Sequence, residues 1–455
     1  MPRWFLAALL LPALGPPAIA QDAKKKNVVL LVADDLGMQL GCYGDRTTRT
    51  PNLDRLASQG TRFTHGFASV ASCSASRATL LTGLPTHQCG QFGHAHAEHN
   101  VHTFRQVRSI PLLLNAAGYR TGVVGKLHVQ PQAVYPFHVE TPARNVVQLA
   151  DQVRAFLAGR NGMPFYLHVG FGEPHRVGTG FGNDAKFAAG VPAVTFDPAA
   201  VTVPAFLPDN ADTRGEWAGY LQAVARLDHG VGLVLRVLEE AGVMDDTLVI
   251  FLSDNGPPFQ GAKTTLYDPG VHLPLLVRRP GAKTAATCNA MASWTDIAPT
   301  VLDWAGVPAP KGLPGRSLLP VLTQERPTGW DVVYGSHQFH EITMYYPMRS
   351  VRTRSHKYII NLAHQLPVPH ASDLWASPTW QGVLRRGDRR FGLRPVEQYT
   401  NRPREELYDL TSDPNEIQNL AQAPAHAESL NDLRRRCRAW QEATNDPWLV
   451  KYTHE

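Results

Sequence analysis

Residues 27–35 read NVVLLVADD and combine a fully apolar run with a pair of carboxylates. A continuous β-branched run of this kind is typical of a strand that is buried on both faces in a parallel sheet. Asp34 and Asp35 follow at the carboxyl end of that strand, where open α/β sheets place their active sites. A solvated turn is the alternative, but two adjacent acids that are buried require a cation.

Further strand and helix patterns alternate downstream. Strands are predicted at residues 120–128, 165–171, 246–253 and 273–277. Helices are predicted at residues 50–56, 110–117, 146–157 and 214–241. This alternation predicts an α/β fold with a mostly parallel sheet flanked by helices. Beyond a proline-rich crossing, short antiparallel strands are predicted at 332–335, 348–354 and 357–361, and an amphipathic helix at 425–442.

The length of 455 residues predicts one large and one smaller domain. Residues 1–20 have the pattern of a cleaved signal peptide: Arg3, an apolar core and the small-residue sequence Ala18-Ile19-Ala20. We therefore predict a signal peptide at 1–20, a catalytic domain at 21–325 and a small domain with an antiparallel sheet at 326–455. The signal peptide predicts that the protein is secreted or periplasmic, and we see no segment long enough to span a membrane.

Composition narrows the function classes. Hydrophobic residues make up 43% of the chain and charged residues 18%, as in ordinary globular proteins. A net charge of +5 is too mild for a nucleic-acid binder, although it suits an anionic substrate. The five cysteines, at 42, 73, 89, 288 and 437, are too scattered for a zinc cluster and leave disulfide pairing open.

Polar residues follow several of the predicted strands. Asp34, Asp35, Asp254 and Asn255 supply oxygen ligands, which suit a hard divalent ion, and we favour calcium over magnesium. A basic set would surround an anion bound to that metal: Arg77, Lys126, His128, His175 and Lys263. If residues 120–128 form one strand, Lys126 and His128 share a face and point into the same cavity.

Residues 72–83 read SCSASRATLLTG and predict a loop that opens a short helix, with Ser72 or Ser74 as its cap. An ordinary buried cysteine is the alternative reading for Cys73. The following stretch is rich in histidine, at positions 87, 94, 96, 99 and 102. Their irregular spacing favours surface or substrate-cleft positions over a metal-binding tract.

The sequence C-x-A-S-R followed by L-L-T-G resembles the signature of the type I sulfatases. The resemblance implies an alkaline-phosphatase-like fold, and oxidation of Cys73 to formylglycine by a maturation enzyme. The hydrate of formylglycine would attack sulfur, steadied by Arg77. Asp34, Asp35, Asp254 and Asn255 would bind one calcium ion together with the modified Cys73. By the same resemblance, Lys126, His128, His175 and Lys263 would hold the sulfate and handle protons.

Within that family the chain resembles the sulfamidase subfamily, through stretches such as EPHR, RLDHGVGLVL, HEITMYYPMRSV and DPNEIQNLA. The resemblance implies hydrolysis of the N-sulfate of N-sulfoglucosamine at the end of heparin or heparan sulfate chains, and it allows a homodimer. His340, Glu341 and Arg349 are then candidates for sugar contacts, with ordinary strand-surface residues as the alternative. Two departures stand out: Ala75 replaces the commoner proline, and Lys263 replaces the arginine of animal sulfamidases.

Three alternatives stay open. The enzyme could be an O-sulfatase acting on another sulfated glycan. With Cys73 unmodified, the same metal site could hydrolyse phosphoesters instead. A noncatalytic glycan-binding protein is the third alternative, although the complete set of ligands and cations argues against it.

Overall fold

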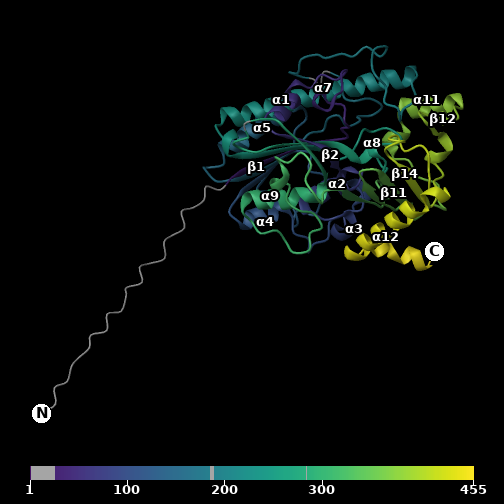
Figure 1. Cartoon of the computed structure of the whole chain (residues 1–455). Coiled ribbons are helices and arrows are strands. Elements are labelled where there is room, and N and C mark those ends of the chain that lie inside the picture. The colour runs from purple at the N-terminus through teal and green to yellow at the C-terminus, as the bar shows by residue number, and fades with distance from the viewer. Residues whose placement is uncertain (2–25, 185–188, 283, 455) are drawn as a thin grey trace.

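The computed structural model describes residues 1, 26–184, 189–282 and 284–454 (Figure 1). The predicted signal peptide, apart from Met1, lies outside the described residues. Across the described part of the chain, no helix has both the length and the apolar character needed to cross a membrane.

A mostly parallel sheet of eight strands forms the centre of the molecule, in the order β4-β3-β5-β1-β6-β7-β2-β8. Among the strands that the structure describes in this sheet, only β7 runs antiparallel to its neighbours, β6 and β2. The α/β fold class is therefore confirmed. The strands are β1 (Asn27–Ala33), β2 (Thr61–Phe67), β3 (Arg120–Gly125), β4 (Val139–Thr141), β5 (Phe165–Gly170), β6 (Thr247–Ser253), β7 (His272–Arg278) and β8 (Ala286–Ser293).

Helices cover both faces of this sheet, as the alternation predicted. In Figure 1, α1, α5 and α7 lie on one side of it, and α4 and α9 on the other. The strand β1 shows why both faces must be covered: Val29 and Leu31 pack into the core beneath α5 and α7, whereas Val28 and Leu30 pack toward α4 and α9. The helices of this part are α1 (Pro51–Ser58), α2 (Cys73–Thr82), α3 (Thr86–Cys89), α4 (Ile110–Ala116), α5 (Val146–Ala158), α7 (Ala211–Glu240), α8 (Asp268–Val271) and α9 (Ile297–Ala305).

The C-terminal part contains a four-stranded antiparallel sheet in the order β14-β11-β10-β9, so the expected small sheet is present. Its strands, with the short pair β12 and β13, are β9 (Val332–His337), β10 (Met348–Thr353), β11 (His356–Asn361), β12 (Arg390–Phe391), β13 (Arg394–Pro395) and β14 (Glu405–Asp409). Its helices are α10 (Ser372–Trp375), α11 (Pro378–Arg386), α12 (Ala427–Ala443) and α13 (Lys451–His454). Trp380 and Val383 of α11 pack beside α7, in the core that Val29 and Leu31 share with α5 and α7. The boundary at residue 325 stays a prediction.

Two details of the sheet bear on the site. β3 ends at Gly125, three residues earlier than we predicted. Gly125 has φ of +82°, and a Cβ there would meet the carbonyl oxygen of Gly170 at 2.1 Å. Glycine therefore lets the chain leave β3 close against β5 and turn toward the carboxyl edge.

The cysteines do not form disulfides. All five lie within the described residues, and each has a free thiol there. Cys73, Cys89, Cys288 and Cys437 are buried. The pairing that the sequence left open is thus absent from the described structure.

Candidate active site

Two neighbouring strands deliver acidic residues to one edge of the large sheet. β1 and β6 are parallel and in register along their length, so Asp34 and Asp254 follow at the same level. The backbone N–H of Asp35 donates to Oδ1 of Asp254 across 3.1 Å, and Nδ2 of Asn255 donates to Oδ1 of Asp35 across 2.6 Å. All four side chains are buried. The structure therefore brings the four oxygen-bearing residues together.

Two oxygens in this group lack a hydrogen-bond partner among the described residues, although both are buried: Oδ1 of Asp34 and Oδ1 of Asn255. A buried acceptor of this kind is costly unless a donor or a cation meets it. Carboxylate and amide oxygens are the ligands that calcium and magnesium take in proteins. Ligand atoms of Asp34, Asp35, Cys73 and His175 also lie within 4.8 Å of one another. This donor set fits a divalent metal ion.

Cys73 is the first residue of α2, the helix that begins beside the acids. Its Sγ lies 3.8 Å from Oδ1 of Asp35. Of the two expected caps, Ser72 occupies the N-cap position, although its side chain makes no capping hydrogen bond, and Ser74 lies inside the helix. Burial raises the pKa of the Cys73 thiol well above its ordinary value, although Lys263 opposes that effect.

Arg77 lies one helical turn beyond Cys73, with its guanidinium wholly inside the protein. Its Nε donates to Oδ2 of Asp254 across 2.8 Å, and Nη2 lies 3.6 Å from Oδ1 of Asp34. Nη1 donates to the carbonyl oxygen of Lys126 across 2.8 Å. Arg77 therefore ties α2 to both acid-bearing strand ends and to the loop after β3.

Lys126 and His128 lie in the loop after β3, which corrects the strand that we predicted for them. The side chains of both residues still line the same cavity. His128 does so from a left-handed backbone conformation, with φ of 65°. Such a conformation is costly for a residue with a Cβ and is found mainly where the surroundings enforce it. Nζ of Lys126 lies 2.5 Å from Oδ2 of Asp34.

His175 and Lys263 converge on one carboxylate. Nδ1 of His175 and Nζ of Lys263 lie 2.5 Å and 3.0 Å from Oδ2 of Asp35. Lys263 also donates to Oδ2 of Asp373 across 2.8 Å. Burial would lower the pKa of Lys263, but Asp35 and Asp373 together raise it well above its ordinary value. The ammonium group therefore stays charged.

The pKa of Asp254 is shifted upward, whereas those of Asp34 and Asp35 are shifted downward. Burial raises the pKa of Asp34, but nearby cations, Lys126 foremost, hold it well below the ordinary value. Burial raises the pKa of Asp254 to about 7 despite the pairing with Arg77, and the charges of Asp34 and Asp35 add to the rise. Crowded acids of this kind repel one another, and a bound divalent cation relieves that repulsion.

Cys73 and several of the cations around the acids line a cavity of about 490 Å³, whereas Asp34, Asp35 and Asp254 are not among its lining residues. Seven residues that the sequence predicted line it: Cys73, Lys126, His128, His175, Lys263, His340 and Glu341. Five lining residues were not among the predicted site residues: His94, His96, His99, Ser372 and Asp373. The histidines were expected at the surface or in the cleft, and these three do lie in the cleft.

The three candidates for sugar contacts have different positions. His340 lines the cavity, and its Nδ1 lies 2.9 Å from Oγ of Ser72. Glu341 also lines it and accepts the N–H of Ser372 across 2.8 Å. Arg349 does not line this cavity: it is fully buried, and its Nε and Nη2 donate to Asp446 across 2.6 and 2.9 Å. The expected sugar contact is therefore corrected, because this side chain is held inside the C-terminal part.

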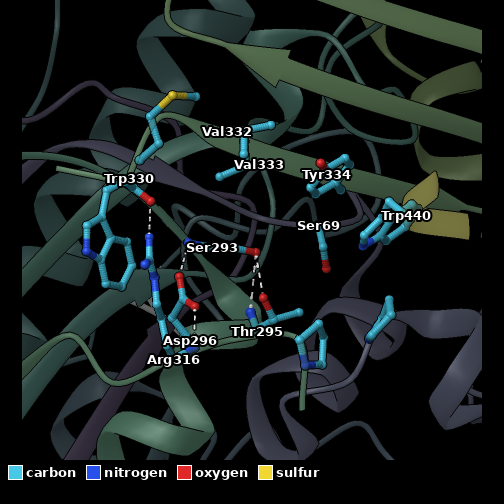
Figure 2. Close-up of a pocket in the computed structure, with 14 residues that line it drawn as sticks. Ser69, Ser293, Thr295, Asp296, Arg316, Trp330, Val332, Val333, Tyr334 and Trp440 are labelled. Carbon is cyan, nitrogen blue, oxygen red and sulfur yellow. Dashed lines mark hydrogen bonds between the residues drawn. The ribbon is translucent and has the colours of Figure 1, made fainter. Parts of the chain in front are cut away.

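A second cavity, of about 350 Å³, lies between the two sheets (Figure 2). The rings of Tyr334 and Trp440 stack there with centroids 5.1 Å apart. The guanidinium of Arg316 lies 3.8 Å from the centre of the Trp330 ring. The carboxylate of Asp296 accepts two backbone N–H groups. Among its described lining residues this cavity has no group of nucleophile, acid and base comparable to the first.

Comparison with known proteins identifies the family. The sulfatase family model matches residues 26–136 and 132–307. The chain belongs to the sulfatase family. A model for the C-terminal part of N-sulphoglucosamine sulphohydrolase matches residues 261–378 of this sulfatase. Human N-sulphoglucosamine sulphohydrolase is 42% identical to it over 94% of this chain and 92% of the human protein.

Solved structures share the fold of this sulfatase. One is a protein in complex with its substrate D-glucosamine-2-N,6-O-disulfate, with a TM-score of 0.69 and 21% identity, covering 93% of this chain and 99% of the other. The phosphonate monoester hydrolase of Agrobacterium radiobacter has a TM-score of 0.69 and 20% identity, covering 92% and 96%. At these identities the likeness shows the fold alone.

Asp373 is the cavity residue that sequence reasoning missed most clearly. It pairs with Lys263 from a separate part of the chain, the short helix α10. Residues 370–376 read HASDLWA, with no apolar strand before the acid to mark it as a site residue. Ser372, its neighbour, bonds Glu341 through both its N–H and its hydroxyl. Only the folded structure of this sulfatase brings these residues to the cavity.

Proposed function

We propose that this chain is an exported hydrolase that removes the N-sulfate of N-sulfoglucosamine at the end of heparin or heparan sulfate chains. The observation that carries the reaction class is the buried group around Cys73: two acid-bearing strand ends, a thiol 3.8 Å from Asp35, and cations on the same carboxylates. The 42% identity to human N-sulphoglucosamine sulphohydrolase supports the choice of substrate. The signal-peptide pattern of residues 1–20 supports export.

Asp34, Asp35, Asp254 and Asn255 would hold one calcium ion, and Cys73 is the residue that a maturation enzyme would convert to formylglycine. When present, the calcium ion would act as a Lewis acid toward the sulfuryl oxygens, and formylglycine would supply the attacking oxygen. One buried oxygen on each of Asp34 and Asn255 accepts no hydrogen bond from the described residues, which supports the metal. We propose calcium rather than magnesium because calcium accepts an irregular shell of several oxygen ligands.

The chain's own cations would bind and balance the sulfate. Lys126 and Lys263 line the cavity and are fixed by Asp34 and Asp35, so their ammonium groups are in place before substrate arrives. Positioned charges of this kind stabilise a centre whose negative charge shifts toward the leaving group. Arg77 is more deeply buried and would act by holding Asp34 and Asp254 in place.

His175 is the proposed proton donor to the leaving nitrogen. Its Nδ1 is held by Asp35, so Nε2 is the atom that can carry a proton into the cavity. The amine of a sulfamate is a poor leaving group unless it is protonated, so a positioned acid is needed. His340 and Glu341, on the cavity wall, would contact the sugar.

The experiment that tests this function measures sulfate released from N-sulfoglucosamine and, in parallel, from 6-O-sulfated glucosamine. Release from the N-sulfate alone, abolished in Cys73→Ala, is the expected result. The opposite preference would make the protein an O-sulfatase. Phosphate release from a phosphomonoester, without release of either sulfate, would instead favour a phosphoester hydrolase with unmodified Cys73.

A further inference from the structure

Three histidine side chains meet at the cavity mouth. Each of His94, His96 and His128 offers one ring nitrogen, and the three nitrogens lie within 4.8 Å of one another. The ring centroids are 4.8 Å apart for His94 and His96, 4.6 Å for His96 and His128, and 5.0 Å for His94 and His128. Neither His94 nor His96 has a part in the proposed hydrolysis.

Two of these rings are unusually close. Nδ1 of His96 lies 2.5 Å from Nε2 of His128. Two imidazole nitrogens at this distance must share a proton or a cation, because their lone pairs otherwise repel. A zinc ion binds imidazole nitrogens at about 2.0–2.1 Å, which places two tetrahedral ligands roughly 3.3 Å apart. If the two rings moved apart by this small difference, a metal ion could bind between their nitrogens.

The surroundings suit a metal that enters from solvent. His96 is exposed, His94 is buried and His128 is half-buried, so the group has one open side. Burial lowers the pKa of His94 to about 2 and also lowers that of His128, so both rings are neutral, as metal ligands must be. Nδ1 of His128 is buried without a hydrogen-bond partner among the described residues.

Three cations lie near this group: Lys126, Lys263 and Arg77. Lys126 is the cation that acts on both His96 and His128, and it is paired with Asp34 at 2.5 Å. Lys263 and Lys126 both act on His94, and Lys263 is paired with Asp35 and Asp373. Asp373 is not one of the proposed calcium ligands, so its charge still reduces the repulsion that a second cation would meet when calcium is bound.

We propose that His94, His96 and His128 form a binding site for a divalent transition-metal ion such as zinc, separate from the oxygen-lined metal site. Imidazole suits zinc and copper, whereas carboxylate and amide oxygens suit calcium, so the two sites differ in the ion they select. An ion here would occupy His128 and narrow the cavity mouth, and so inhibit hydrolysis. Inhibition rests on the proposed function, whereas binding does not.

The test measures zinc binding to the calcium-saturated protein by equilibrium dialysis. One zinc ion per chain is expected in the wild type. His96→Ala should weaken binding about tenfold or more, because a ligand is lost. His364→Ala removes a histidine from outside this cavity and should bind zinc like the wild type. A thermal unfolding curve checks that each variant is folded.

Cys73→Ser separates this site from the Asp34, Asp35, Cys73 and His175 group. Zinc affinity that is unchanged in Cys73→Ser and about tenfold or more weaker in His96→Ala supports the proposal. Loss in Cys73→Ser, wild-type affinity in His96→Ala, or no zinc bound to the wild type would overturn it. In the active enzyme, zinc should inhibit sulfate release, and His96→Ala should need about tenfold more zinc for the same fractional inhibition.

Discussion

Sγ of Cys73 lies 3.8 Å from Oδ1 of Asp35, and the other oxygen of that carboxylate contacts both His175 and Lys263. One carboxylate thus links the start of α2 to a proposed proton donor and a proposed sulfate-binding cation. A nucleophile derived from Cys73 would act beside the oxygen ligands of the metal.

Asp254→Asn should remove metal binding while preserving the fold. The amide keeps the size of the side chain but loses the negative charge that a divalent ion requires, so activity should fall about 10²-fold or more. Metal content after dialysis and sulfate release at graded calcium concentrations measure the effect. Asp303→Asn changes an exposed acid on α9 and serves as the control. Full activity in Asp254→Asn, or after exhaustive chelation, would refute the metal assignment.

His175→Ala should affect substrates according to their leaving groups. If His175 donates a proton to the leaving nitrogen, the loss on N-sulfoglucosamine should be about 10²–10⁴-fold. The loss on an activated aryl sulfate should be much smaller, because its leaving group departs without a proton. Steady-state kinetics on the two substrates give the comparison. Equal losses on both would rule out His175 as the acid.

Arg349→Ala should destabilise the fold rather than alter sugar binding. Its guanidinium is fully buried and bonded to Asp446 through two nitrogens. Removing one partner of such a pair costs about 3–5 kcal/mol of unfolding free energy, because the other charge stays buried alone. The control is Arg436→Ala, which breaks an exposed ion pair between Arg436 and Asp432, both on α12. It should cost less than about 1 kcal/mol of unfolding free energy. Urea denaturation measures both, and a raised KM at unchanged stability would contradict this role.

The buried pair of Arg349 and Asp446 also predicts that the free energy of unfolding depends on pH in the acid range. Burial would raise the pKa of Asp446, but its hydrogen bonds with Arg349 and their charge attraction lower it below the ordinary value. A lowered folded-state pKa gives stability that is complete above the pKa of the unfolded chain, about 4, and is lost as pH falls below it. The difference in unfolding free energy between wild type and Asp446→Asn should therefore shrink between about pH 5 and pH 3. A difference that does not change with pH would contradict the pairing.

The central strands of the fold were predictable because their signals are local. β1 and β6 are continuous apolar runs, and each is followed by an acid pair or an Asp-Asn pair. A parallel register then places the residues after each strand at the same edge, so their proximity follows from the strand assignment alone. β2 and β8 were missed because they read TRFTHGF and ATCNAMAS, in which polar residues interrupt the apolar pattern.

The parts of the site that depend on distant contacts could not be predicted in this way. Arg349 lies on a strand with a mixed pattern, and its partner Asp446 is 97 residues away. Nothing in the local sequence shows whether such a side chain faces a cavity or the interior. Asp373 reaches the cavity from the four-residue helix α10 and His96 from an irregular segment, and neither is long enough in regular structure for periodicity to fix the direction of a side chain.

The central claim is that Cys73 is converted to an aldehyde and that the converted residue performs the hydrolysis. Mass spectrometry of the peptide containing residue 73, from enzyme purified in active form, measures this directly. The account predicts formylglycine at residue 73, in a fraction that rises and falls with specific activity between preparations. An intact cysteine in fully active enzyme would contradict it.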